Sequence, residues 1–327
     1  MRKVLVYATW TVATLGGTSP VALAQAPVSF PSKPIRLIVP FAPGGPTDIW
    51  ARLIGQRMQE SWPQPVVVEN RAGGTGQIGS IAIRDAPPDG YSLLFTSNSA
   101  HVISPLLREP RTFDSIRDFT PISMVLKYPM YLLLNPKVPA QSVQALIALA
   151  KSQPGKLNYA SVGTGSGGHL GCELFNIAAG TNIAHVPYKG AAPAQASLIA
   201  GETQMMCDSV GFSHAQVKAG RLRGLALFSS KRSAAAPEVP TLAEAGVPHV
   251  EGYIWLGLLG PANLPATVLS KLSTETIRIM NLPELRDRVI SGGSDLVANT
   301  PDQFSHEMRI DADTWLGVIR EKKIKAE

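Results

Sequence analysis

The sequence is poor in cysteine. Only Cys172 and Cys207 occur among its 327 residues, and their spacing matches no zinc motif. In an exported protein one disulfide could join them, and two buried free thiols are the alternative. The six histidines are dispersed, and no two of them are four residues apart as in a helical metal site. We therefore predict no metal site, and the pairing of the cysteines stays open at this stage.

A long apolar run is also absent. No segment reaches the roughly 20 uncharged apolar residues that span a bilayer. The stretch VLVYATWTVATLGG (4–17) follows Arg2 and Lys3 and precedes Ala22-Leu23-Ala24. A charged start, a short apolar centre and small residues at the cut are typical of a secretory signal peptide. We predict that residues 1–24 are removed after Ala24 and that the mature chain is a soluble exported protein.

No large cluster of one charge is present. The formal net charge is +6, and it falls to +4 once Arg2 and Lys3 are removed. The remaining basic residues are scattered, whereas a nucleic-acid-binding surface needs them gathered on one face. We predict no nucleic-acid partner.

The motif of a serine hydrolase is missing. A nucleophile elbow has glycine two residues before the serine, but Thr164 stands at that position before Ser166. We find no other arrangement of a nucleophile with an acid or base, so we predict that the protein is not an enzyme.

The sequence does contain alternating strand-like and helix-like segments. The run KPIRLIVPF (33–41) is rich in branched apolar residues, and 47–62 carries apolar residues at helical spacing. The same plan recurs along the chain, which indicates an α/β fold with parallel strands. About 300 mature residues favour two domains. Residues 120–136 look like two extended runs, and these together with 250–265 would cross between the domains.

Two stretches match G-x-G-x-x-G: Gly74-x-Gly76-x-x-Gly79 and Gly163-x-Gly165-x-x-Gly168. A dinucleotide site would also need an acidic residue at the end of the next strand. The first motif is followed there by Thr96-Ser97-Asn98 and the second by Tyr188-Lys189. The lysine alone would not exclude NADP, but export argues against either nucleotide. We therefore predict no cofactor.

Glycine turns before helices have another use. The first N–H groups of a helix are unpaired and carry partial positive charge, so such a turn holds carboxylates as well as phosphates. Four turns occur at such positions: three contain glycine, at 44–48, 73–76 and 163–166, and the fourth is Ser97-Asn98-Ser99. Ligands of open α/β sheets bind beyond the carboxyl ends of the strands. We expect these turns to line a cleft from both domains.

Three segments resemble a known family. PSKPIRLIVPFAPGGPTDIWARLIGQRM (31–58), VVVENRAGGTGQIGSIAIRDAPPDGYSLLF (66–95) and PEVPTLAEAGVP (237–248) are similar to the TctC-like, or Bug, periplasmic solute-binding proteins of tripartite tricarboxylate transporters. The resemblance runs from about residue 30 to the C-terminus. It implies a type II periplasmic-binding-protein fold: two α/β lobes joined by a two-strand hinge, with the ligand cleft between them.

The domains then expected are the signal peptide 1–24, lobe 1 at 27–126, lobe 2 at 127–252 and a return to lobe 1 at 253–327. Strands near 125–130 and 250–256 would flex. The implied ligand is a small organic carboxylate, captured in the periplasm for the permease subunits of the transporter by a monomeric receptor. A receptor that signals to a membrane kinase and an exported enzyme acting on a carboxylic acid are the alternatives, and the sequence does not identify the ligand.

The resemblance also implies ligand-binding residues. In the first lobe they are Phe41, Gly44, Gly45, Thr47, Asp48, Gly74, Thr75, Gln77, Ser97 and Ser99; in the second they are Thr164, Ser166, His169, Tyr188, Lys189 and Asp208. Three of these have other roles open to them. Asp48 could cap its helix, His169 could be a buried structural histidine, and Lys189 could be a solvated surface lysine.

Overall fold

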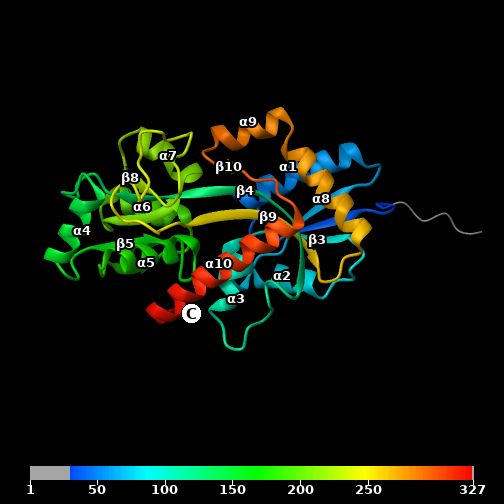
Figure 1. Cartoon of the computed structure of the whole chain (residues 1–327), viewed down its shortest axis with the longest axis horizontal. Helices are drawn as coiled ribbons and strands as arrows, with labels where there is room; N and C mark the ends of the chain where they lie inside the picture. The colour runs from blue at the N-terminus through cyan, green and yellow to red at the C-terminus, as the bar shows by residue number, and fades with distance from the viewer. Residues whose placement is uncertain (1–29, 326–327) are drawn as a thin grey trace, which may run out of the picture.

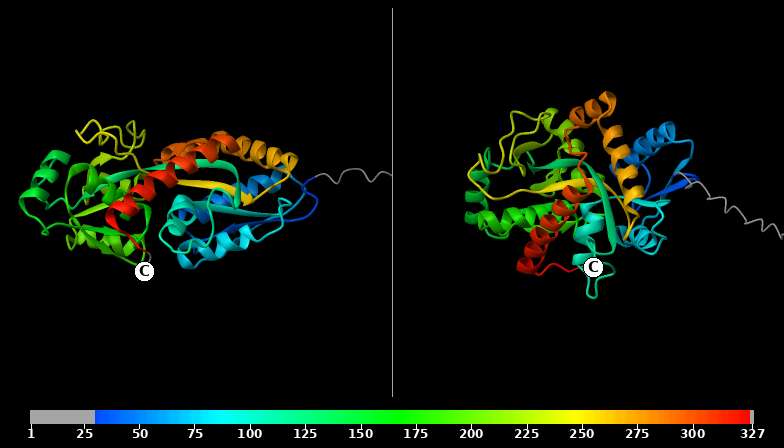
Figure 2. Two further views of the ribbon diagram at one scale, coloured as in Figure 1. Left: turned by 60° about the horizontal axis from the view of Figure 1, so that its bottom comes forward. Right: turned by 45° about the vertical axis from the view of Figure 1, so that its right-hand side comes forward.

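The computed structural model describes residues 30–325, which form two α/β lobes lying side by side (Figures 1 and 2). The predicted signal peptide lies outside these residues. No helix within 30–325 is long and apolar enough to cross a membrane.

The first lobe is built on a mixed sheet. Its spatial order is β2 (Val66–Asn70), β1 (Ile35–Val39), β3 (Ser92–Ser97), β9 (Tyr253–Pro261) and the first part of β4 (Phe119–Leu134), with β10 (Asp295–Leu296) on the far edge of β4. The first three strands are parallel, and β9 is antiparallel to both β3 and β4. Its helices and helical turns are α1 (Pro46–Ser61), η1 (Gly74–Gly76), α2 (Gln77–Arg84), η2 (Ser99–Ile103), α3 (Ser104–Leu106), α8 (Ala266–Met280) and α9 (Pro283–Ser291).

The second lobe repeats the plan around the other end of β4. Here β4 lies between β8 (Arg223–Leu227) and β7 (Met205–Ser209), and β7 continues to β5 (Asn158–Ser161) and β6 (Ala184–Pro187). The helices are α4 (Val143–Ser152), α5 (Gly167–Ala179), α6 (Ala191–Ala200) and α7 (Val210–Lys218). Strands β5, β6 and β7 are parallel, so their carboxyl ends meet at one edge of the sheet.

Strand β4 belongs to both lobes. Residues Phe119–Pro129 pair with β9, and residues Met130–Leu134 pair with β7 and, in part, with β8. The change of partner falls beside Pro129, which has no N–H to donate to a ladder. The two extended runs expected at 120–136 are therefore one strand. Its two prolines are tolerated because Pro121 sits beside a register shift and Pro129 lies at the end of the β9 ladder, where a missing donor costs little.

The last helix, α10 (Pro301–Lys322), packs against elements of both lobes (Figure 1). A capping box at Thr300 and Gln303 starts it. Phe304 in its first turn and Trp315 further along are buried beside the crossing strands. At its end the ammonium group of Lys322 lies 3.1 Å from the carboxylate of Glu173 on α5.

Helix α1 shows how the sequence pattern becomes structure. Pro46 occupies its first turn, where a missing N–H costs nothing. Trp50, Ile54 and Met58 follow at helical spacing, and all three are buried against the sheet. The helix predicted at 47–62 is thus confirmed within one residue at each end. Helices α7 and α9 had no counterpart among the predicted elements.

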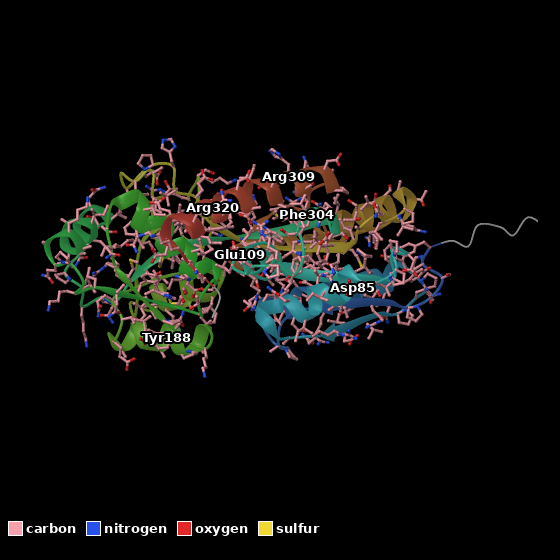
Figure 3. The ribbon with its side chains drawn as sticks, turned by 90° about the horizontal axis from the view of Figure 1, so that it is seen from below. Asp85, Glu109, Tyr188, Phe304, Arg309 and Arg320 are labelled. Atoms are coloured by element: carbon pink, nitrogen blue, oxygen red, sulfur yellow. A yellow bond between two sulfur atoms is a disulfide. The ribbon has the colours of Figure 1, made fainter. Side chains whose placement is uncertain are left out.

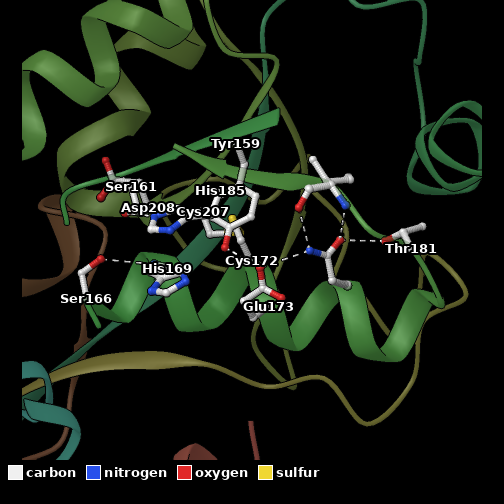
Figure 4. The surroundings of a disulfide bond; sticks show 12 residues. Tyr159, Ser161, Ser166, His169, Cys172, Glu173, Thr181, His185, Cys207 and Asp208 are labelled. Atoms are coloured by element: carbon white, nitrogen blue, oxygen red, sulfur yellow. Dashed lines mark hydrogen bonds between the residues drawn. A yellow bond between two sulfur atoms is a disulfide. The ribbon is translucent and has the colours of Figure 1, made fainter. Parts of the chain in front are cut away.

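The two cysteines form a disulfide between α5 and β7 (Figure 4). The Cα atoms of Cys172 and Cys207 are 5.6 Å apart, and 35 residues separate them in sequence. Both belong to the second lobe, so the bond joins the middle of α5 to β7 and does not link the two lobes.

The third glycine of each G-x-G-x-x-G match is a packing position. A Cβ on Gly79 would meet the backbone of Pro40 at 3.0 Å, and one on Gly168 would overlap the carbonyl oxygen of Cys207. Each glycine therefore lets a helix approach the end of a strand more closely than any other residue would.

We predict opposite effects for two glycine-to-alanine substitutions. Gly168→Ala should lower the free energy of unfolding by about 1–3 kcal/mol, because the added methyl group forces α5 away from β7. Gly317→Ala in α10, where nothing lies within 4 Å, should raise it by about 0.5–1 kcal/mol through helix propensity. Urea denaturation of the two variants measures both changes. Equal effects of the same sign would contradict the packing argument.

Candidate functional site

A cavity of about 1020 Å³ lies between the two lobes. Its wall contains residues that follow the carboxyl ends of β1, β3, β5, β6 and β7, while Tyr128, Ile254 and Leu256 come from the crossing strands β4 and β9. This is the place where ligands bind in open α/β sheets. The cavity is thus formed by both lobes and by the strands that connect them.

Four helices begin at the cavity wall. The residues that precede α1, α5, α6 and α7 are Gly45, Ser166, Gly190 and Ser209, and all four line the cavity. Ser166 caps its own helix by accepting a hydrogen bond from the N–H of His169. The other three starts have no side-chain cap, so their first N–H groups remain available to an anion.

Eleven of the sixteen predicted site residues line this cavity. They are Phe41, Gly45, Thr47, Thr75, Ser97, Ser99, Thr164, Ser166, Tyr188, Lys189 and Asp208. The structure thus brings together residues from six separate segments of both lobes. Whether they touch a ligand remains a prediction.

The other five predicted residues lie outside the wall; they are Gly44, Asp48, Gly74, Gln77 and His169. The side chains of Asp48, Gln77 and His169 form hydrogen bonds that hold the neighbouring loops in shape. The carboxylate of Asp48 accepts a hydrogen bond from the N–H of Gly44, and the amide of Gln77 donates to the hydroxyl of Ser104.

Asp48 holds the loop between β1 and α1 in place through several hydrogen bonds. Besides the N–H of Gly44 at 2.9 Å, its carboxylate receives hydrogen bonds from Arg52 and from the side-chain amide of Asn70. Asn70 in turn donates to the carbonyl of Phe41. Burial opposes ionisation of Asp48, but these hydrogen bonds outweigh it and hold the pKa of its carboxyl below the usual value.

His169 has the matching role in the second lobe (Figure 4). Its Nδ1 accepts a hydrogen bond from the N–H of Gly165 at 2.9 Å, which fixes the turn before α5. The ring stacks on that of His185, with centroids 3.8 Å apart. Burial and the neighbouring His185 lower the pKa of His169 to about 3, so its ring is neutral at physiological pH. Its imidazole therefore supports the turn.

The serine turn at Ser97–Ser99 is held by α10. Between the two serines the buried side chain of Asn98 donates to the carbonyl of Tyr253 at 2.7 Å and to Asp311 of α10 at 3.2 Å. Asp311 also accepts hydrogen bonds from the indole N–H groups of Trp255 and Trp315. Burial raises the pKa of the Asp311 carboxyl to about 6. The last helix of the chain therefore sets the position of a turn that lines the cavity.

The wall carries more positive than negative charge. Among residues 30–325 its basic side chains are Arg108, Lys189 and Arg288, and its one acidic side chain is Asp208. Both oxygens of Asp208 accept hydrogen bonds, from the N–H of Ser209 and the hydroxyl of Ser213. Burial raises the pKa of this carboxyl to about 6. The balance favours an anionic ligand.

The described residues contain no group of three or more His, Cys, Asp or Glu side chains that could hold a metal ion. The site therefore consists of helix N-termini, hydroxyl groups and a few basic side chains.

Comparison with known protein families identifies the family of this chain. The family described as the tripartite tricarboxylate transporter family receptor, TctC, matches residues 50–324. The chain belongs to this family. Among the relatives of this TctC family member, Protein BugT of Bordetella pertussis (strain Tohama I) is 36% identical over 315 residues, which cover 96% of this chain and 95% of BugT.

Solved structures agree with this assignment. The structure of R. palustris Rpa4515 with adipate has a TM-score of 0.81 and 31% identity, covering 91% of this chain and 99% of that one. MatC (Rpa3494) from Rhodopseudomonas palustris with bound malate has a TM-score of 0.78 and 28% identity, covering 89% and 100%. The TctC family member therefore has the fold of the periplasmic solute-binding proteins, as the sequence predicted.

Sequence reasoning missed several residues of the cavity wall. Ser209 and Gly190 follow strands and could have been found by the rule that located their neighbours. Arg108 and the segment 291–294 follow helices instead, so no strand–turn pattern marks them. Ile49 and Phe212, exposed by 39% and 41%, line the cavity from opposite lobes, but in sequence they look like ordinary positions on helix surfaces.

We predict that His169 makes the protein sensitive to acid. Its pKa is about 3 in the folded protein against an ordinary value of 6.5, so between these values the unfolded chain takes up a proton that the folded one does not. The free energy of unfolding should therefore fall as the pH drops below about 6.5, by up to about 1.4 kcal/mol per pH unit from this group. In His169→Asn the fall between pH 7 and pH 4 should be smaller.

Urea denaturation at several pH values checks this. The matched control is His306→Asn, because that histidine is exposed on α10; it should keep the wild-type pH dependence. Other buried groups titrate in both variants, so the difference between them isolates His169. Parallel curves for wild type and His169→Asn would show that this ring does not control acid stability.

Proposed function

We propose that the protein is a periplasmic receptor that captures a small organic carboxylate and delivers it to the membrane permease of a tripartite tricarboxylate transporter. The observation that carries the proposal is the convergence of four helix starts on one cavity between two lobes. Unpaired N–H groups at helix starts bind carboxylates by hydrogen bonds and by the helix dipole. The bound acids in two related structures, adipate and malate, belong to the same chemical class.

The ligand contacts we propose are the eleven predicted residues in the cavity wall. Thr47, Ser97, Ser99 and Thr164 bring hydroxyl groups that can donate to carboxylate oxygens. Ser99 lies close to the second lobe, since a Cβ on Gly167 would be 3.4 Å from its Oγ. A ligand held at this point would contact both lobes at once.

Several features support binding rather than catalysis. The Nδ1 of His169 is occupied by the N–H of Gly165, so it cannot take a proton from a serine of the wall. The hydroxyl of Tyr188 is paired with that of Ser197 on α6 at 2.5 Å. Asp208 is held by Ser209 and Ser213. His169, Tyr188 and Asp208 thus have structural partners.

The mechanism we propose is closure of the lobes about β4 and β9. We take 27–126 with 253–327 as one lobe and 127–252 as the other, so the strands cross near Pro129 and Tyr253. A ligand that contacts both walls binds the closed form more tightly, and its differential affinity shifts the equilibrium towards closure.

A thermal-shift screen of organic acids tests the ligand class. A carboxylate present at 100 times its Kd should add about 2.7 kcal/mol to the free energy of unfolding and raise the unfolding temperature. The amides of the same acids serve as uncharged controls. No shift with any mono-, di- or tricarboxylate, or an equal shift with the amides, would contradict carboxylate capture.

Small-angle scattering tests closure. Adding the acid with the largest thermal shift should reduce the radius of gyration, because the lobes approach each other around the cavity. The control is an acid that gives no thermal shift, which should leave the radius unchanged. An unchanged radius with a tightly bound acid would rule out hinge closure as the binding mechanism.

A further inference from the structure

Arg108 is a half-buried basic side chain in the cavity wall, and one N–H donor of its guanidinium group lacks an acceptor. It follows α3 and lines the cavity, and its Nε is buried without a hydrogen-bond partner among the described residues. A guanidinium group has five N–H donors and accepts nothing. Leaving a donor of a charged group buried and unpaired is costly, so an acceptor is expected at this point.

Half of the sixteen arginines within residues 30–325 form ion pairs, and Arg108 is not among them. Eight of them lie within 4.0 Å of a carboxylate: Arg36, Arg52, Arg57, Arg71, Arg84, Arg117, Arg232 and Arg278. Within residues 30–325 Arg108 has no such carboxylate. The acid of the cavity wall, Asp208, already has both oxygens engaged. The described part of the chain thus supplies Arg108 with no anionic partner.

The position of Arg108 is fixed by its neighbour. Leu107 packs against the second lobe so closely that a Cβ on Gly165 would overlap its side chain. Arg108 therefore lies where the first lobe meets the turn before α5. In Figure 3 the next residue, Glu109, is near the middle of the molecule, between the two lobes. A ligand enclosed by both lobes would pass this point.

The size and lining of the cavity argue for a separate acidic group. The helix starts can already hold one carboxylate, and the volume of about 1020 Å³ lies at the upper end of ligand pockets. Apolar side chains line much of the wall, among them Ile49, Trp50, Phe212, Ile254 and Leu256. Such a wall suits the apolar middle of a ligand with an acidic group at each end.

We propose that Arg108 binds a second acidic group of the ligand and so selects dianions with an apolar spacer over monocarboxylates. This inference rests on the proposed function and adds to it the residue that determines specificity. A guanidinium group can form two parallel hydrogen bonds to one carboxylate, which a lysine ammonium cannot do.

Isothermal titration with matched acids tests the proposal. The probes are α,ω-dicarboxylates of increasing length and the monocarboxylates with the same number of carbons, measured against wild type, Arg108→Gln and Arg108→Lys. Arg108→Gln should weaken dicarboxylate binding about tenfold to a hundredfold, and change monocarboxylate binding less than about twofold. Arg108→Lys should lie between the two, since it keeps the charge and loses the paired geometry.

The matched control is Arg286→Gln, because Arg286 is exposed on α9 and lies outside the cavity wall. It should change dicarboxylate affinity only about twofold, as expected for a solvated charge. Unfolding temperatures of all variants without ligand verify that each is folded.

Three outcomes would overturn the inference. Equal losses for mono- and dicarboxylates in Arg108→Gln would mean that Arg108 holds the same carboxylate as the helix starts. An equal effect of Arg286→Gln would mean that only overall charge matters. If wild type binds dicarboxylates and Arg108→Gln has no effect on this binding, Arg108 does not determine specificity, although the proposed carboxylate capture would stand. If wild type binds none of the acids, the proposed function fails as well, so the two failures are distinguishable.

Discussion

The antiparallel ladder between β4 and β9 is the interaction on which the rest of the structure depends. Through it β4 is a strand of the first lobe, and beyond Pro129 the same strand becomes part of the second. Because Tyr128, Ile254 and Leu256 belong to this pair and also line the cavity, the floor of the site is the connection between the lobes. In the proposed closure, a ligand on that floor would touch the strands that bend as the lobes approach each other. Helix α10, through Asp311 and Asn98, ties the neighbouring serine turn to the same place.

The two G-x-G-x-x-G matches show what a glycine motif encodes. In both lobes the third glycine, Gly79 or Gly168, allows a helix to lie against the end of a strand. Dinucleotide-binding folds need the same close approach, so the motif marks a geometry shared by several ligands. The nature of the ligand depends on what surrounds the turn, which here is a set of hydroxyl groups and uncapped helix starts. Within the first turn Thr75 has a φ of 56°, a left-handed conformation that is rare for a β-branched residue. Thr75 also lines the cavity.

Much of the fold and of the candidate site could be predicted from local sequence patterns, because strands, turns and helix starts have local causes. Helix α1 and the loops after β1, β3 and β5 follow from apolar spacing and glycine placement. The direction of a side chain has no such local cause. Asp48 and His169 stand beside cavity residues, yet they point to the backbone of Gly44 and Gly165. Arg108 reaches the wall because a distant loop packs on Leu107, and the cysteines meet because α5 lies against β7. These placements depend on contacts between residues far apart in sequence.

The order of strands has a consequence for how the chain assembles. The strands of the second lobe, β4 to β8, follow one another in sequence, and its disulfide closes within them. The first lobe differs, because β9 fills the place between β3 and β4 and comes from the last quarter of the chain. Domains generally form as the chain emerges from its N-terminus. The second lobe can thus complete its sheet and oxidise its cysteines while the first, although made earlier, still lacks its middle strand. The first lobe is thus synthesised first, but its sheet is completed last.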